Sequence, residues 1–347
     1  MKIGIITFHW ATNYGAILQS YCLQEYLREQ GHHIEIINYK PKQYDFSWIK
    51  LLSNPKKWLS IPQILLTIKK EKLLIPFREE YLNQTKRFYR ECEMTNFSSR
   101  YDAIISGSDQ ILNSYFTLRG EGNSSTSAYF LGFASPNCKC LGYAVSFGCT
   151  EYAKQAINIA TKWIQKFDCI GLREITGINI ISKLQYNKYS QLVPDPTLLY
   201  GSKLFDDFNI HFTTQKKDYI CVYMLRHVIR LGGKVKYIDE TKKPLTMKEW
   251  LSTISSASAL ITNSYHGMIM AILSQVPFAV LLETGRSSGM NDRFLTLLSK
   301  LNLEDRIVYN IDDVYNVLRK RIDFNNVDQK ISVFRQEGVD FIKKALL

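Results

Sequence analysis

The stretch that decides the fold reads ASALITNSYHG at residues 257–267, and the apolar run MIMAILSQV follows it at 268–276. Residues 260–262 are typical of a short buried strand, and a helix is expected to begin at Gly267. Residues 263–266 would then lie at the carboxyl end of the strand, where α/β proteins bind ligands. Free backbone N–H groups and the helix dipole favour an anion at such a turn, and Ser264 and His266 add side-chain donors. A lone histidine is more often structural than catalytic, but this position favours a function for His266.

Length and composition indicate a folded protein with room for two domains. The chain has 347 residues, of which 46% are hydrophobic and 22% charged. Lysine and arginine total 44 against 32 acidic residues, so the net charge is +12. Nucleic acid, an anionic membrane surface or a small multiply charged substrate could each account for this charge. We expect no nucleic-acid partner, because the sequence contains no helix-turn-helix, zinc-finger or RNA-binding signature.

The sequence favours a cytoplasmic location. The apolar run at residues 3–8 is too short for a signal peptide and reads as a first strand. No window approaches the ~18 consecutive apolar residues of a membrane span. Seven cysteines at scattered positions suit a reducing compartment, and no spacing indicates a metal site or a bound cofactor.

A βαβ unit opens the chain. Residues 3–8 and 34–39 are predicted strands, and a helix is expected between them from about Tyr14 to Gln30. The loop before the helix lacks the Gly-x-Gly-x-x-Gly spacing of dinucleotide sites. Asn13, Tyr14 and Gly15 lie at the carboxyl end of the first strand and are candidate ligand contacts, although Asn13 could simply cap the helix.

Residues 41–100 are predicted to form a helical insertion rich in basic and aromatic side chains. Such a segment can lie on an anionic bilayer, with each cation contributing about 1 kcal/mol near the surface. The alternative is a solvated helical insertion. Peripheral contact with the inner face of the plasma membrane is therefore a candidate interaction.

Two further strand ends carry candidate site residues. After the strand at 101–105, the turn holds Ser106, Gly107, Ser108 and Asp109, where small residues allow close approach and the carboxylate can reach a bound hydroxyl. Ser108 or Asp109 could instead act only as a helix cap.

After the strand at 168–172 comes Arg173, which could bind a carboxylate or phosphate in bidentate fashion. The alternative for this arginine is an ion pair with Glu174 or another nearby acid.

The second half repeats the alternation of strand and helix. The glycine-rich turn at 283–289 carries Arg286, and Arg293 opens the next helix. We predict two Rossmann-like βαβ domains facing a central cleft, at residues 1–200 and 201–325, with a C-terminal helix at 326–347.

Several motifs together resemble the polysaccharide pyruvyl transferase family. They are KIGI at residues 2–5, NYGAILQ at 13–19, YD at 101–102, SGSDQ at 106–110, LRE at 172–174, DPTLL at 195–199 and SYHG at 264–267. The resemblance extends from Lys2 to about Lys300. It implies a two-domain fold like that of GT-B glycosyltransferases. It also implies transfer of the pyruvyl group of phosphoenolpyruvate, as donor substrate, onto two hydroxyls of a sugar. The product would be a cyclic ketal on a bacterial surface polysaccharide or its lipid-linked precursor.

By this resemblance, His266 is assigned to donor binding and proton transfer, and Arg173 to clamping phosphate or carboxylate. Arg286 stands where relatives have a basic residue. Asp109 and the Asn13 loop would face the acceptor sugar and could supply a base. The resemblance thus implies that the first domain binds the acceptor and the second the donor. One departure is the segment 224–234, which is too short for the helix that the family usually has there.

Two other functions stay open. A GT-B glycosyltransferase using a nucleotide-sugar would need a carboxylate on the ribose, which Glu283 could supply. A protein without catalytic activity could recognise anionic glycans through its basic surface.

Overall fold

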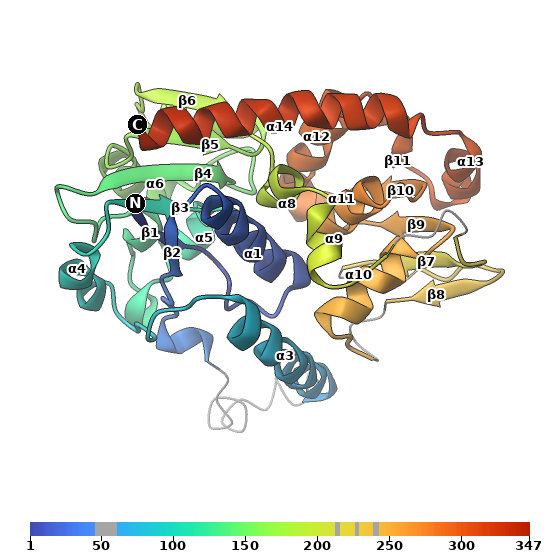
Figure 1. Cartoon of the computed structure of the whole chain (residues 1–347), viewed down its shortest axis with the longest axis horizontal. Helices are drawn as coiled ribbons and strands as arrows, with labels where there is room; N and C mark the ends of the chain where they lie inside the picture. Colours follow the sequence, from blue (N-terminus) through green and yellow to red (C-terminus); the bar gives the residue numbers. More distant parts are fainter. Residues whose placement is uncertain (46–60, 212–215, 226–228, 239–242) are drawn as a thin grey trace.

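The computed structural model describes residues 1–45, 61–211, 216–225, 229–238 and 243–347, with only the backbone of 286–287. In this part of the chain two parallel sheets stand side by side (Figure 1). The first has the strand order β2-β1-β3-β4-β5-β6 and the second β11-β10-β9-β7-β8. The strands are β1 (Lys2–Ile6), β2 (His33–Ile36), β3 (Ala103–Ser106), β4 (Lys139–Val145), β5 (Cys169–Leu172), β6 (Tyr189–Leu192), β7 (Ile220–Tyr223), β8 (Val235–Tyr237), β9 (Ala259–Thr262), β10 (Phe278–Leu281) and β11 (Ile307–Val308). The predicted α/β fold with two Rossmann-like sheets is confirmed.

Helices cover both faces of the first sheet. Apolar side chains alternate along its strands, so that Ile105 faces one core and Ile104 the other. On one face lie α1 (Tyr14–Glu29), α8 (Pro196–Tyr200) and α14 (Phe324–Leu346), and on the other α4 (Cys92–Ser98), α6 (Lys154–Ile164) and α7 (Ile175–Lys183). Shorter elements are η1 (Lys42–Tyr44), α5 (Ser114–Thr117), η3 (Glu121–Asn123), η4 (Ala128–Phe130) and α9 (Lys203–Asp207).

The second sheet is covered unevenly. Helices α10 (Met247–Ser255), α11 (Tyr265–Leu273) and α12 (Asp292–Leu301) pack on one face, and α13 (Val314–Arg319) packs on the other. The connecting turns are η5 (Gly285–Asn291), η6 (Glu304–Arg306) and η7 (Ile311–Asp313). Between β7 and β8, the described residues 224–225 and 229–234 form no helix, and Ile229 and Leu231 pack on the sheet instead.

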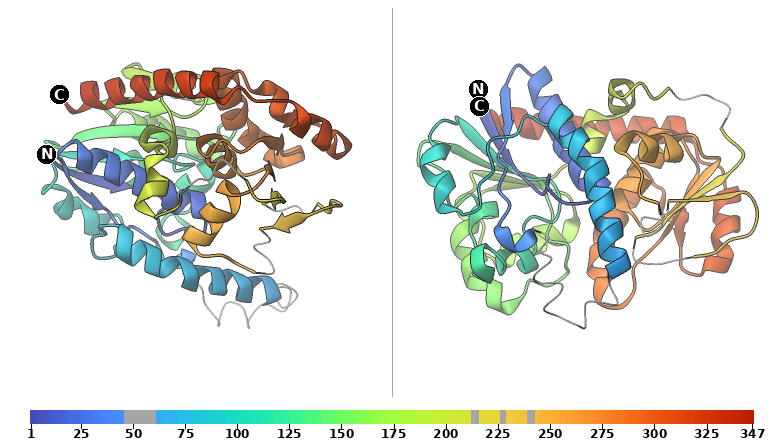
Figure 2. Two further views of the ribbon diagram at one scale, coloured as in Figure 1. Left: turned by 45° about the vertical axis from the view of Figure 1, so that its right-hand side comes forward. Right: turned by 90° about the horizontal axis from the view of Figure 1, so that it is seen from below.

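Helix α14 returns from the second sheet to the first. Figures 1 and 2 show it running along one side of the molecule, so that the C-terminus lies beside the N-terminus. The ring of Phe341 lies 5.8 Å from the ring of Tyr189 and 6.2 Å from that of Tyr143. Lys139 Nζ also donates a hydrogen bond to the carbonyl of Leu346 at 3.0 Å.

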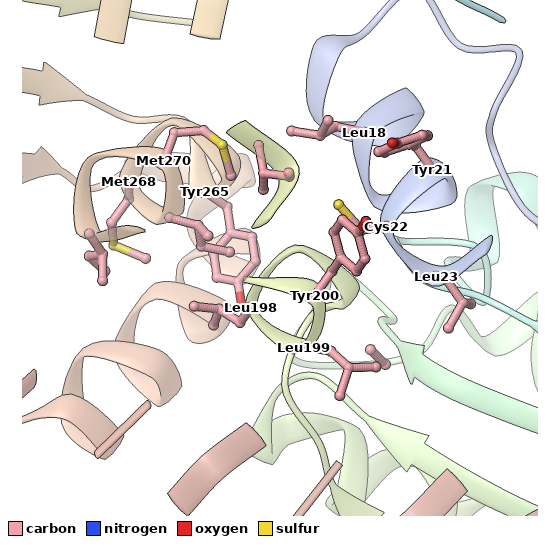
Figure 3. Close-up of a cluster of buried hydrophobic side chains, with 14 of the residues drawn as sticks. Leu18, Tyr21, Cys22, Leu23, Leu198, Leu199, Tyr200, Tyr265, Met268 and Met270 are labelled. Atoms are coloured by element: carbon pink, nitrogen blue, oxygen red, sulfur yellow. The ribbon is translucent and has the colours of Figure 1, made fainter. Parts of the chain in front are cut away.

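One apolar core continues from one sheet to the other. It passes through α1, α8 and α11, where Leu18, Cys22, Leu198 and Met268 are buried together (Figure 3). Short helix α8 lies between the other two and contacts both. The two halves are therefore joined by shared packing as well as by the chain.

Three details differ from the sequence-based expectations. Helix α11 begins at Tyr265 and not at Gly267, because Ser264 caps it and accepts a hydrogen bond from the N–H of Gly267 at 3.2 Å. His266 is therefore already in the first helical turn. Strand β6 was not predicted, since Tyr189–Leu192 is a half-exposed edge strand without an apolar run. Strand β2 ends at Ile36, earlier than expected.

The predicted helical insertion contains α3 (Ile61–Tyr81) and α4, while residues 46–60 lie outside the described part. Several of its basic and aromatic side chains point inward. Lys70 and Arg78 are buried, and Arg78 pairs with Glu71 at 2.7 Å and donates to the carbonyl of His9 at 2.9 Å. These two cations cannot face a membrane, and the membrane-facing surface stays a prediction for the exposed remainder. No helix within the described ranges is both long and apolar enough to span a bilayer.

Tyr14 joins the two halves at the start of α1. Its ring stacks on that of Trp250 in α10, with the centroids 5.1 Å apart. Its hydroxyl donates to the carbonyl of Leu245 at 2.7 Å and accepts from the N–H of Leu245 at 2.9 Å. This side chain therefore satisfies both backbone groups of a residue in the other half.

We expect Tyr14→Phe to lower the free energy of unfolding by about 1–3 kcal/mol, because both backbone groups of Leu245 lose their partner. Urea unfolding at neutral pH measures the change. The matched control is Tyr44→Phe, which removes one hydroxyl bond to the carbonyl of Arg119 at 3.0 Å near the surface. Equal effects of the two variants would contradict this role of Tyr14.

Candidate active site

Ionisable side chains gather where the carboxyl ends of the two sheets meet. We call this group the interdomain cluster. Its members are Asp109, Arg173, Glu174, Asp195, His266 and Arg293. The first four follow strands β3, β5 and β6 of the first sheet, and the last two belong to α11 and α12 of the second half. Parallel strands place their carboxyl ends at one edge, so residues far apart in sequence converge here.

Asp195 is at the centre of the cluster. Its Oδ2 lies 3.1 Å from Arg173 Nη1 and 3.6 Å from His266 Nε2, so a nitrogen from each half approaches the same oxygen. Its Oδ1 accepts hydrogen bonds from the backbone N–H and the hydroxyl of Thr197, at 3.0 and 2.7 Å. Burial alone would raise the pKa of Asp195, but His266 and Arg173 outweigh burial and hold this pKa well below its usual range. Asp195 is therefore ionised at neutral pH.

Three carboxyl groups surround the guanidinium of Arg173. Besides Asp195, its guanidinium approaches Asp109 Oδ1 at 3.2 Å and Glu174 Oε2 at 3.7 Å. The arginine side chain is fully buried, whereas Asp109 keeps 17% of its side chain exposed. The ion-pair alternative raised for Arg173 is therefore the arrangement in this structure. Of its three partners, Asp109 is the one nearest to solvent.

His266 reaches the cluster because of a glycine in the other half. A Cβ atom on Gly15 would lie 2.1 Å from His266 Nδ1, so only glycine admits the imidazole at this point. Gly15 lies in the first turn of α1, whose N-terminal N–H groups point toward this region. The imidazole thus lies between the amino end of α1 and the carboxylate of Asp195.

A helix cap between the two halves holds the chain next to Arg293 in place. The adjacent Asp292 accepts hydrogen bonds from the N–H and hydroxyl of Thr176, at 2.8 and 2.7 Å, and so caps α7. The guanidinium of Arg293 lies 5.6 Å from the ring centre of Tyr265, and that of Arg173 lies 5.0 Å from the same ring. Burial and the charge of Arg173 lower the pKa of Arg293 to about 10, so it remains a cation at neutral pH. Its Nε is buried without a hydrogen-bond partner.

The turn after β3 brings Asp109 into place. Gly107 has φ +130°, and a Cβ there would lie 2.1 Å from the carbonyl oxygen of Tyr143, so this backbone requires glycine. Ser108 donates to the carbonyl of Ala144 at 2.9 Å and lies 3.3 Å from Asp195 Oδ2. Burial alone would raise the pKa of Asp109, but Arg173 and then His266 outweigh it and hold the pKa low.

Most of these converging residues lie in a stretch of sequence that matches the model of a known family. The model of the polysaccharide pyruvyl transferase family matches residues 13–286. The chain belongs to this family. The match includes the Asn13 loop, Arg173, Asp195 and His266, while Arg293 lies just beyond it. A comparison with curated proteins finds no match in sequence.

Solved structures with the same fold share little sequence with this pyruvyl transferase family member. The UDP-GlcNAc 2-epimerase from Methanocaldococcus jannaschii is 11% identical with a TM-score of 0.51, covering 97% of this chain and 99% of that one. Arabidopsis thaliana UGT89C1 complexed with UDP-L-rhamnose is 9% identical with a TM-score of 0.50, covering 99% and 94%. The S. aureus MnaA–UDP structure is 12% identical with a TM-score of 0.50, covering 99% and 96%. At these identities the likeness establishes the two-domain fold alone.

The structure brings together only part of the predicted site. Asp109, Ser108, Arg173, His266, Gly15 and Arg293 converge on the cluster. The others make local or packing contacts: Asn13 caps α1, Tyr14 stacks on Trp250, Ser106 bonds the carbonyl of Tyr129, and Ser264 and Gly267 bond each other. The side chain of Arg286 lies outside the described part of the structure.

Sequence reasoning missed Asp195, Glu174, Asp292 and Tyr265 as members or supports of the site. Asp195 was not recognised as a candidate site residue, because the strand before it was not predicted. Its one available signal was its place in the family motif DPTLL. Within the described ranges, no group of three or more His, Cys, Asp or Glu side chains is arranged to hold a metal ion.

We expect Gly15→Ala to destabilise the protein by roughly 1–3 kcal/mol and to displace the imidazole, because the new methyl group overlaps His266. In an ordinary helix the same change stabilises by about 0.5–1 kcal/mol, so the sign of the effect is diagnostic. Urea unfolding measures it. Gly232→Ala is the control, since no atom lies within 4 Å of a Cβ there. A more stable Gly15→Ala variant would contradict the close contact.

We expect Asp195→Asn to cost roughly 2–4 kcal/mol of stability at pH 7, because Arg173 and His266 lose a shared buried charge. A carboxyl group with a depressed pKa stabilises above its unfolded-state pKa and loses that effect as the pH falls. The difference in free energy of unfolding between wild type and variant should therefore become smaller below about pH 4. Urea unfolding across pH tests this. The control is Asp45→Asn, which weakens partly exposed ion pairs with Arg87 and Lys40 and should cost less than about 1 kcal/mol. A difference in free energy of unfolding that does not change with pH would contradict the low pKa of Asp195.

Proposed function

We propose that this protein transfers the pyruvyl group of phosphoenolpyruvate onto two hydroxyls of a sugar in a bacterial surface polysaccharide or its precursor. The observation that supports it best is the meeting of His266, Arg173 and Arg293 at the facing edges of both sheets, in a member of this family. A donor with one phosphate and one carboxylate needs several cations in a partly dry site. Membership of the family supports the transferase class.

In this proposal Arg293 and His266 make the first contacts with the donor. Arg293 is a cation with a buried Nε that has no hydrogen-bond partner. Its guanidinium lies 5.6 Å from the ring centre of Tyr265, and that ring contacts the imidazole of His266 edge-on. Both residues belong to the second half, in keeping with a donor side there. The N–H groups at the start of α1 add a favourable dipole for an anion.

Arg173 would reach the donor by exchanging one carboxylate for another. Asp109 is its most exposed partner, so a donor carboxylate can replace Asp109 while Asp195 and Glu174 keep their positions beside Arg173. The exchange would free Asp109 to accept a proton from the attacking sugar hydroxyl. Because Arg173 is the strongest influence that lowers the pKa of Asp109, neutralising this arginine makes the carboxylate a better base.

The nucleotide-sugar alternative has less support. Glu283, the candidate ribose ligand, is buried, and its Oε1 accepts a hydrogen bond from Asn263 Nδ2 at 2.9 Å. Its backbone N–H and carbonyl are both bonded to the side chain of Asn291, at 2.9 and 2.8 Å. This carboxylate is therefore held within the second half rather than presented to a ligand.

The acceptor in this proposal is a glycan or a lipid-linked sugar, reached at the inner face of the plasma membrane. The net charge of +12 favours approach to an anionic surface or substrate. Exposed lysines of α3, such as Lys69 and Lys72, are available for such an approach.

We expect phosphoenolpyruvate at a hundred times its dissociation constant to stabilise the protein by about 2.7 kcal/mol, measured as a thermal shift. Release of inorganic phosphate with a panel of acceptor glycans should follow, and His266→Ala should abolish it. The control is His33→Ala, which changes an exposed histidine. Stabilisation by a UDP-sugar and not by phosphoenolpyruvate would overturn the proposal in favour of a glycosyltransferase. Glycan binding that is unchanged in His266→Ala, without turnover, would favour a binding protein.

A further inference from the structure

We propose that Glu174 carries the proton that reaches the methylene carbon of phosphoenolpyruvate, an inference that rests on the proposed function. Protonation of this carbon is required, because the donor methylene becomes a methyl group in the ketal. The side chain of Glu174 is 3% exposed and lies inside the interdomain cluster. Of the other two carboxyl groups of the cluster, Asp109 is the proposed base and Asp195 is bound by Arg173, His266 and Thr197.

The position of Glu174 frees its side chain for chemistry. It is the N-cap residue of α7, yet its carboxyl group does not cap this helix. The N–H groups of Ile175 and Thr176 are capped instead from the second half, by Thr296 Oγ1 at 3.2 Å and Asp292 Oδ2 at 2.8 Å. Glu174 Oε1 turns back to accept a hydrogen bond from the N–H of Phe147 at 3.1 Å. Its Oε2 is buried and has no hydrogen-bond partner.

The three carboxyl groups of the cluster differ in the direction in which their surroundings shift the pKa. Burial raises the pKa of Glu174, and Arg173 and Ser146 offset this only in part. The pKa values of Asp109 and Asp195 are lowered, so these two remain carboxylates. Carboxyl groups whose environments separate their pKa values in this way divide into an acid and a base. Glu174 is then the acid, and Asp109 is the base for the acceptor.

The charged and titratable groups that act on Glu174 come from both halves. Arg173 precedes it in the chain, and Arg293 acts from α12. A negative charge on Glu174 in turn raises the pKa of Tyr265 and of Cys149. A donor anion on Arg293 and Arg173 would neutralise the two cations that favour the ionised form of Glu174. Donor binding therefore keeps the proton on this residue until the carbon accepts it.

The reaction balances with these two residues. The O–H bond of Glu174 breaks as a C–H bond forms at the donor methylene carbon. The first sugar oxygen bonds to the adjacent carbon, and its proton passes to Asp109. The bond from this carbon to the phosphate oxygen then breaks, and the second sugar oxygen bonds in its place. The proton of the second hydroxyl restores Glu174, and the phosphate leaves with the proton from Asp109.

Glu174→Gln tests the inference, because an amide oxygen can still accept the Phe147 N–H bond while the acidic proton is lost. We expect kcat for phosphate release to fall by about 100-fold or more, with KM for phosphoenolpyruvate and its thermal shift nearly unchanged. Wild-type activity should decline as the pH rises through the pKa of Glu174. The residual activity of Glu174→Gln should not show this decline. Glu174→Asp keeps a carboxyl group and should retain more turnover than Glu174→Gln.

The matched control is Glu91→Gln, because Glu91 Oε2 accepts a backbone N–H from Ser127 at 3.1 Å outside the cluster. It should leave kcat unchanged. If wild type converts phosphoenolpyruvate and Glu174→Gln does so at a similar rate, the role of Glu174 is refuted and the proposed function stands. Equal turnover by the aspartate and glutamine variants would also refute this role, including where both fold poorly. If wild type neither binds nor converts phosphoenolpyruvate, the proposed function itself fails, and this inference fails with it.

Discussion

The carboxylate of Asp195 is the constraint on which the arrangement of the two halves depends. A charge without solvent contact is costly unless oppositely charged groups and hydrogen-bond donors surround it. The first half supplies Arg173 and Thr197, and the second supplies His266. Neither half alone supplies all of these partners for the two carboxylate oxygens of Asp195. Electrostatics therefore favours the one relative placement in which the facing strand ends share these groups.

Apolar packing beside the cluster acts in the same direction. The core that runs through α1, α8 and α11 and the stacked pair of Tyr14 and Trp250 flank the ionic groups on the interface. Such surroundings lower the local dielectric response, which strengthens each ionic contact and raises the penalty for an unpaired group. The most exposed member, Asp109, then marks the side from which a polar ligand can enter the cluster with the least rearrangement.

Sequence reasoning located most of the strand ends but not the contacts between them. The turns after β1, β3, β5 and β9 were identified because apolar runs end there in small or polar residues. That reasoning could not show that Arg173 would meet Asp195 and Asp109, since pairing between distant turns is decided by tertiary structure. It also missed the edge strand β6, which lacks an apolar run, and the capping of α7 by Asp292 from another helix. Gly15 was singled out as a candidate, but its reason, the close approach of His266, appears only in three dimensions.

The return of α14 has a consequence for how the protein is made. The face of the first sheet that Phe341 covers includes β4 to β6, which the ribosome completes roughly 150 residues before this helix emerges. At about 5–20 residues per second, that face stays uncovered for roughly ten to thirty seconds of synthesis. During this time the apolar face of the first sheet is accessible to chaperones. Without the final helix this face would stay exposed permanently.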